Sequence, residues 1–271
     1  MKTAITCLFS ILILSAPLLG QNASVSPSRL YYKTNIGDYK VQEVSVTNTS
    51  TKPQSFSVSF GDFEPSGMQG KSTVMKQGES PNSCANWLSA DPSYFEIPPG
   101  QTQKVKVMLQ VPGTPEADKV KWAAMKIKLT KEKAAPQEGG SESIGLGISE
   151  TFQFVIHIFQ TPPTVTQKQA EILEFKEITD AGTAERLIML KVKNSGEAIL
   201  DCASYLEITN LRSGQEDRLK PFAYTLLPGT VREVKFTLPA SMDKGKYSML
   251  GVVDYGSRES VQAAEMEIVV E

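Results

Sequence analysis

The residue types that most often carry catalytic chemistry are sparse in this chain of 271 residues. It has a single histidine, His157, whereas most hydrolytic triads and catalytic zinc sites use at least one histidine. The carboxylates of Asp180, Asp201 and Glu207 are scattered, without the spacing of a catalytic pair. We therefore expect no enzyme, no metal site and no cofactor; a carbohydrate-active enzyme is the remote alternative. His157 is interpreted as a hydrogen-bonded structural residue.

The N-terminal segment has the pattern of a secretory signal. Met1 and Lys2 give a positive start, and the apolar stretch at 4–19 is shorter than the roughly 20 residues of a membrane span. Small residues follow, as at a cleavage site. We predict a signal peptide at 1–21, with an uncleaved anchor as the alternative, and a periplasmic protein that is associated with the outer membrane in one version of the hypothesis.

Two cysteines, Cys84 and Cys202, remain after removal of this signal peptide, which takes Cys7 with it. In an oxidising compartment they are candidates for one inter-domain disulfide. Two separate buried thiols are the other interpretation, and the one we favour. The formal net charge of -2 gives no basic footprint for nucleic acid.

The pattern of the remaining sequence predicts β-strands, and these strands must position the candidate residues named above. Apolar and polar residues alternate with a period of two, between turns rich in Pro, Gly and Asn. The clearest segments are 41–47, 55–60, 104–109, 122–129 and 151–159. Short strands at such spacing indicate an all-β antiparallel sandwich or barrel.

The two halves of the chain repeat one plan. An alternating strand ends at Asn48 in the first half and at Asn194 in the second, and each half continues with a Pro-Gly turn and another alternating strand. We therefore predict two tandem immunoglobulin-like β-sandwich domains, at 22–162 and 170–271, with a linker at 163–169. A loop at 131–143, rich in Gly, Ser, Pro and charge, is either a functional or a disordered connection.

The first half resembles the N-terminal domain of PapD-like periplasmic chaperones, which assist pilus and fimbrial subunits. The similar segments are SPSRLYY at 26–32, VSVTN at 44–48, FEIPPGQTQKVKV at 95–107, Trp122, and FQFVIHIFQTP at 152–162. The second half resembles the partner domain of such a protein more weakly.

This resemblance implies a binding site. In the family, two basic residues in the cleft between the domains hold the terminal carboxylate of a client, and the last strand of the first domain is added to the client's sheet. Arg29 stands where the first basic residue is expected, whereas the last strand holds His157 and no Lys or Arg. The implied partner-binding residues are Arg29, Phe152, Phe154, Ile156 and Ile158. Arg29 paired with a surface acid, and a last strand buried on both faces, are the structural alternatives.

The leading hypothesis is an exported protein-binding module, a chaperone-like protein for surface or secreted subunits that binds by β-strand addition. The alternative is a non-catalytic accessory or plug subunit of an outer-membrane translocon, such as a type IX-like secretion system. Both imply a protein partner, with no nucleic acid and no membrane span after signal cleavage.

Overall fold

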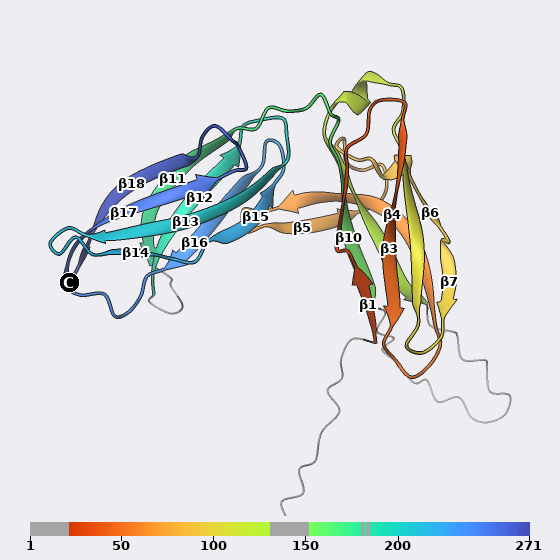
Figure 1. Ribbon diagram of the computed structural model, residues 1–271, viewed down its shortest axis with the longest axis horizontal. Helices are drawn as coiled ribbons and strands as arrows, with labels where there is room; N and C mark the ends of the chain where they lie inside the picture. The colour runs from red at the N-terminus through yellow and green to blue at the C-terminus, as the bar shows by residue number, and fades with distance from the viewer. Residues whose placement is uncertain (1–21, 131–151, 180–181, 183–184) are drawn as a thin grey trace, which may run out of the picture.

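The predicted all-β class is confirmed by the computed structural model, which describes residues 22–130, 152–179, 182 and 185–271. Its strands form two tandem immunoglobulin-like sandwiches, set at an angle to one another (Figure 1). The predicted signal peptide at 1–21, the loop at 131–143 and Asp180 lie outside the described residues.

The first sandwich contains two facing sheets. One has the strand order β1-β3-β8-β6; the other has the order β2-β10-β9-β4-β5, with β7 also paired to β4. Two short 3-10 helices, η1 (Ala85–Trp87) and η2 (Pro115–Asp118), lie in its connections. Its strands are β1 (Ala23–Ser26), β2 (Arg29–Tyr32), β3 (Tyr39–Asn48), β4 (Gln54–Ser66), β5 (Lys71–Met75), β6 (Leu88–Asp91), β7 (Tyr94–Ile97), β8 (Thr102–Gln110), β9 (Lys121–Thr130) and β10 (Gln153–Gln160).

The second sandwich pairs a sheet of order β11-β12-β16 with one of order β14-β13-β17-β18, in which β15 also pairs with β13. None of the pairings among the described strands joins the two sandwiches. The strands are β11 (Ala170–Thr179), β12 (Arg186–Asn194), β13 (Leu200–Asn210), β14 (Glu216–Arg218), β15 (Phe222–Leu226), β16 (Val231–Thr237), β17 (Gly245–Asp254) and β18 (Gln262–Val270).

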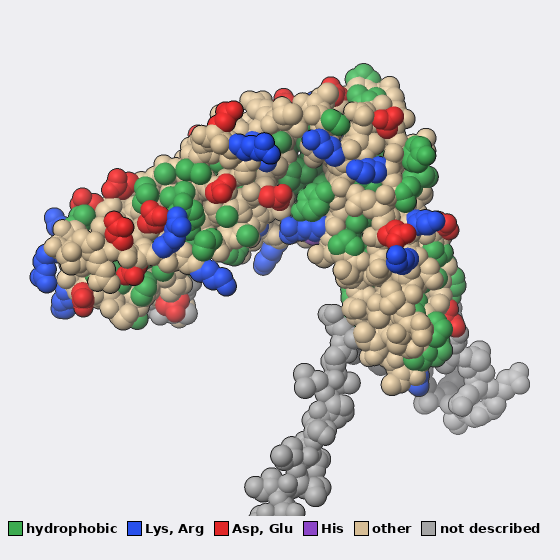
Figure 2. All heavy atoms as spheres, viewed as in Figure 1, with side chains coloured by type: hydrophobic (Ala, Val, Ile, Leu, Met, Phe, Trp, Pro, Cys, Tyr) green, Lys and Arg blue, Asp and Glu red, His purple; other side chains and the backbone are tan. Residues whose placement is uncertain are grey.

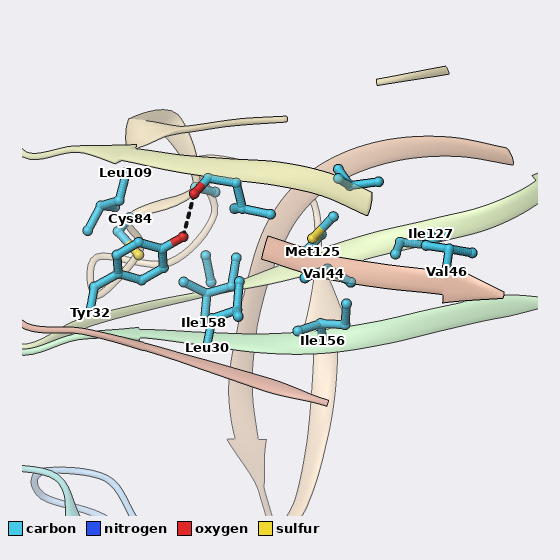
Figure 3. Close-up of a cluster of buried hydrophobic side chains, with 14 of the residues drawn as sticks. Leu30, Tyr32, Val44, Val46, Cys84, Leu109, Met125, Ile127, Ile156 and Ile158 are labelled. Carbon is cyan, nitrogen blue, oxygen red and sulfur yellow. Dashed lines mark hydrogen bonds between the residues drawn. The ribbon is translucent and has the colours of Figure 1, made fainter. Parts of the chain in front are cut away.

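Alternate residues of the strands fill the first core. Leu30 and Tyr32 of β2 and Ile156 and Ile158 of β10 lie fully buried between the sheets (Figure 3). The Tyr32 hydroxyl donates a hydrogen bond of 2.7 Å to the carbonyl of Val107, so this buried polar group is satisfied (Figure 3). Residues 30, 32, 156 and 158 thus anchor β2 and β10 to the opposite sheet.

The two cysteines lie in different cores. Cys84 is buried in the first sandwich and Cys202 in the second, and both thiols are free. The inter-domain disulfide considered from the sequence is therefore not formed. Burial raises the pKa of the Cys202 thiol to about 12 and raises that of Cys84 as well. Both side chains behave as small apolar residues of the core.

A buried asparagine organises the same turn in each sandwich. The Asn48 side-chain amide donates to the carbonyls of Lys52 (2.7 Å) and Ile97 (2.8 Å). The Asn194 amide donates to those of Ala198 (2.8 Å) and Leu226 (3.0 Å). The backbone carbonyl of each asparagine accepts from the glycine of the following Pro-Gly turn, at Gly100 and Gly229 respectively. The repeated sequence plan is therefore a repeated hydrogen-bonding plan.

An apolar cluster joins the two sandwiches. Phe63, Trp122 and Phe159 of the first sandwich pack with Leu227 of the second, and Val165 of the connecting segment lies against them. The Trp122 indole also donates a 2.9 Å hydrogen bond to the Phe63 carbonyl, which satisfies its buried N–H. This cluster is the apolar part of the contact between the two bodies.

The connecting segment is itself hydrogen-bonded to the second sandwich. The carbonyl of Gln169 accepts from the N–H groups of Ser195 and Gly196, and that of Gln167 accepts from those of Glu197 and Ala198. A Cβ at Gly196 would lie 2.7 Å from the backbone nitrogen of Gln169, so the close approach of the two segments requires glycine there.

Replacing Asn48 should destabilise the first sandwich. In Asn48→Ala, two carbonyls lose their donor, and the expected loss of unfolding free energy is about 2–3 kcal/mol. Urea unfolding followed by tryptophan fluorescence measures it, because both tryptophans of the chain, Trp87 and Trp122, lie in this sandwich. Asn86→Ala, at an exposed position, is the control and should change stability little. An unchanged midpoint in Asn48→Ala would show that the buried amide contributes no net stability.

Candidate functional site

Strand β10 is only half paired on its outer side. It pairs with β9 over its whole length, from Gln153 to Gln160, whereas the parallel strand β2 covers only His157 to Gln160. Along residues 153–156 no described strand occupies the other edge. Consecutive residues of a strand direct their backbone groups to opposite edges. The His157 N–H donates to the carbonyl of Ser28, which lies on the β2 side. Residues 153 and 155 are two and four positions before residue 157, so the backbone N–H and C=O groups of Gln153 and Val155 face the same side, at the open edge.

The structure places the side chains predicted to bind a partner in three environments. Phe152, directly before β10, is 50% exposed, and Phe154 is partly buried against the first core. Ile156 and Ile158 are 1% and 0% exposed and belong to that core. Their side chains reach no partner while the sandwich is closed, and their backbone groups face β9, so these two positions offer a partner no direct contact.

A small apolar cavity of about 80 Å³ lies beside the open edge. Phe152, Phe154 and Leu129 line it, together with Ala23 of β1. The β10 end of the site thus combines an unpaired strand edge with accessible aromatic surface.

Arg29 lies where the open edge meets the second sandwich. It is the register partner of His157, at the first residue of β2. Its Nη1 donates a 3.0 Å hydrogen bond to the Thr225 hydroxyl of β15, which in turn donates to Asp201 at 3.2 Å. The guanidinium therefore bridges the two sandwiches. It contacts the carboxylate of Asp201 only indirectly, through the Thr225 hydroxyl.

His157 lies on the opposite face of β10 from the core. Its ring centroid is 4.5 Å from that of Phe63, and its Nε2 is 3.3 Å from the Ser72 hydroxyl. Burial, and secondarily the neighbouring charge of Arg29, lower the pKa of this imidazole. A neutral, hydrogen-bonded ring agrees with the interpretation of His157 as a structural residue.

Arg29 and His157 line a cleft of about 220 Å³ between the sandwiches. Besides Arg29, two other cationic side chains line this cleft. Lys71 comes from β5 and Arg232 from β16, and the lining includes no carboxylate. Lys and Arg side chains gather on the concave side of the bend in the molecule (Figure 2).

Sequence analysis did not identify Lys71 and Arg232, although the pattern of β16 carries a signal for the arginine. Arg232 alternates with Val234 and Phe236, both of which are buried. A charged residue on the inward face of an amphipathic strand is unusual and merits attention. Lys71 follows a glycine turn on an exposed hairpin and has no comparable signal.

Within the described residues, no group of His, Cys, Asp and Glu side chains could hold a metal ion. The same part of the chain has no helix that is long and apolar enough to span a membrane. The cleft and the open strand edge are therefore the features from which we argue function.

The lowered pKa of His157 predicts a stability that depends on pH. The unfolded chain takes up a proton near the ordinary imidazole pKa of about 6.5, whereas the folded chain does so only at lower pH. The wild-type protein should therefore lose stability as the pH falls from about 7.5 to about 5. His157→Gln keeps a polar side chain and should lose less over the same range. Melting temperatures of both proteins across it provide the test; parallel curves would contradict a buried neutral imidazole.

Neither a protein-family model nor a curated protein matches the chain. Among solved structures, a chain from a chaperone–tip adhesin complex of CFA/I fimbriae biogenesis is similar with a TM-score of 0.47 and 11% identity, covering 90% of this chain and 98% of that chain. A chain from the CsuC–CsuE chaperone–tip subunit pre-assembly complex of Acinetobacter baumannii is similar with a TM-score of 0.45 and 12% identity. The match covers 90% of this chain and 98% of that chain. The E. coli chaperone DraB is similar with a TM-score of 0.44 and 16% identity, and the match again covers 90% of this chain and 98% of that chain. The solved structures that this chain resembles thus include fimbrial chaperones.

Proposed function

We propose that this protein is an exported, chaperone-like binding module that takes up a partner protein by β-strand addition at β10. The observation that carries the proposal is the open edge at residues 153–156, beside a strand whose other half is already paired by β2. An unpaired edge offers a row of backbone donors and acceptors to an extended segment.

The length of β2 determines where an added strand must end. The His157 N–H is already bonded to the Ser28 carbonyl, so the added strand stops at that point. Arg29 stands there, and a strand that runs parallel to β10, as β2 does, brings its carboxyl end to this guanidinium. A charge-assisted bond to a terminal carboxylate is stronger than a neutral one. Arg29 would thereby set the register of the partner.

The side chains along the edge supply apolar contacts. Phe152 and Phe154 line the cavity beside the open edge, and both retain exposed surface for a partner. Ile156 supports the site only indirectly, because its side chain anchors β10 in the core and its backbone groups face β9. The binding surface is thus narrower than the four-residue apolar face inferred from the sequence.

Blocking the open edge should weaken binding. Gln153→Pro removes an N–H that faces the edge and leaves the alternate residues, which bond to β9, in place. For a short peptide with alternating apolar residues and a free carboxyl end, we expect about tenfold weaker binding. This is the effect of losing about one hydrogen bond and of the restricted backbone next to the proline. Fluorescence anisotropy of the labelled peptide with the full chain measures it.

Gln153→Ala is the matched control, because it removes the side chain and keeps the N–H. It should bind the peptide as the wild type does, and circular dichroism should be the same for all three proteins. Equal affinity of Gln153→Pro and Gln153→Ala would rule out strand addition at this edge.

The nature of the partner separates a chaperone from a fixed subunit. For a chaperone, the tagged full chain purified from periplasm carries several partners in low amounts. For an accessory subunit of an outer-membrane translocon, it carries one partner in a fixed ratio. We expect the first result, since the proposed contact surface is a single strand edge and one cationic cleft.

A further inference from the structure

Strand β2 supplies inward side chains to the core of the first sandwich along only part of β10. Leu30 of β2 is level with Ile158 of β10, and both side chains lie fully buried between the sheets (Figure 3). Toward the start of β10, no described strand supplies a side chain level with Phe154 on this side. The row of core side chains that begins at Leu30 is therefore incomplete at the open edge.

The cavity of about 80 Å³ lies at this incomplete end of the core. Phe154 and Leu129 line it from one sheet, and Ala23 of β1 lines it from the opposite sheet. Ala23 is buried in the first core, and Phe154 and Leu129 pack against that core. The other lining residues are Asn22, Phe152 and Gln153. The cavity thus continues the apolar core at the side of the sandwich where β1 and the start of β10 are the outermost described strands.

An added strand would direct one side chain into this cavity. A strand that continues the line of β2 along β10 keeps the register in which Leu30 is level with Ile158. Side chains alternate between the two faces of a sheet. The residue level with Phe154 therefore points inward, as Leu30 does, and its two neighbours point to solvent.

The chain's own first strand is unsuited to fill this place. In a straight continuation of β2 toward the N-terminus, the residues with the same parity as Leu30 would face the core. These residues are Ser24, Ser26 and Ser28. Strand β1 instead pairs with β3 in the opposite sheet, where Ala23 is buried and Val25 packs against the core. The alternation of the sequence thus directs β1 away from β10 and leaves the open edge to a partner.

We propose that the partner segment buries one aliphatic side chain, about the size of valine, in the cavity level with Phe154 and thereby completes the first core. The proposal rests on the proposed function, because the segment reaches the cavity as a strand added to β10. It defines a class of partner: an extended segment with one aliphatic residue between two polar ones. The polar neighbours would lie on the outer face of the sheet, beside Gln153 and Val155.

The volume and the lining determine which side chain fits. An apolar cavity of about 150 Å³ in a protein core binds benzene, and this cavity, at about 80 Å³, has close to half that volume. It therefore holds a branched aliphatic side chain and excludes an aromatic ring. Threonine has nearly the shape of valine, but its hydroxyl loses hydrogen bonds to water on entering an apolar site. The cavity should thus distinguish these two residues by polarity alone.

NMR titration of the full chain, labelled with carbon-13 in the alanine and leucine methyl groups, tests the proposal. The probe is N-acetyl-Thr-Thr-Val-Thr-Thr amide, whose single valine sets the register and whose amide end gives Arg29 no carboxylate. We expect the methyl signals of Ala23 and Leu129 to shift and to show nuclear Overhauser effects to the valine methyls. A central threonine should weaken binding about tenfold, and a central phenylalanine should also weaken it.

Variants that change the size of the cavity give a second measurement. Ala23→Val fills part of it from β1 and should weaken binding of the valine peptide about tenfold, with little effect on a peptide with central alanine. Leu129→Ala enlarges the cavity and should make the phenylalanine peptide bind more tightly than the valine peptide. Ala263→Val, the same change at an exposed position of β18, is the matched control and should bind as the wild type does.

Dissolved xenon tests the cavity without a peptide, because xenon enters apolar cavities in protein cores. The methyl signals of Ala23 and Leu129 should shift with xenon in the wild type and shift less in Ala23→Val. An absence of these shifts in the wild type would overturn the inference, since it would show that the cavity takes up no apolar group.

Equal affinities of the valine and threonine peptides, with Gln153→Pro still weakening both, would overturn this inference and leave strand addition at β10 standing. Unchanged binding of the valine peptide in Ala23→Val would overturn it in the same way. If Gln153→Pro does not weaken peptide binding, the proposed function fails and this inference fails with it, whatever the xenon shifts show about the cavity.

Discussion

The apolar contact between the two sandwiches is the constraint on which the functional surface depends. Phe63, Trp122, Phe159 and Leu227 pack together at the junction, and the cleft lies beside them on the concave side of the bend (Figure 2). Without this contact, Arg29 and Arg232 would belong to two bodies joined mainly by isolated polar contacts, such as the Arg29–Thr225 hydrogen bond. Cations that face each other repel, so a contact of another kind has to hold them close. Apolar burial, which is independent of charge, does so here.

The sequence predicted the architecture well because its signals are local. Alternation at 104–109 and 122–129 corresponds to β8 and β9, and the repeated Asn and Pro-Gly turns correspond to Asn48 and Asn194 in equivalent hydrogen-bonding positions. Each sandwich needs a buried side-chain amide to bond a turn to a carbonyl of a distant strand. The same residue type, asparagine, is therefore recognisable at this turn in both halves of the sequence. The state of the two cysteines depends instead on tertiary packing, which sequence separation does not reveal.

The sequence indicated some residues of the candidate site, and their role in binding stays a prediction. Arg29 was identified through family resemblance, and its strand brings it to the junction. The apolar residues 152, 154, 156 and 158 share one alternating face in the sequence, and the burial of Ile156 and Ile158 against the opposite sheet could not be separated from partner contact by periodicity alone. Arg232 is more than two hundred positions from Arg29 in the sequence. Their proximity follows from the packing of one sandwich on the other, which no local pattern encodes.

The hydrogen bonds of the connecting segment also have a mechanical meaning. Gln167 and Gln169 bond to residues 195–198 of the second sandwich, so a force that pulls the bodies apart first loads these bonds and the apolar junction together. A partner strand held at β10 would pull on both sandwiches, and tension on it would be transmitted through the apolar junction.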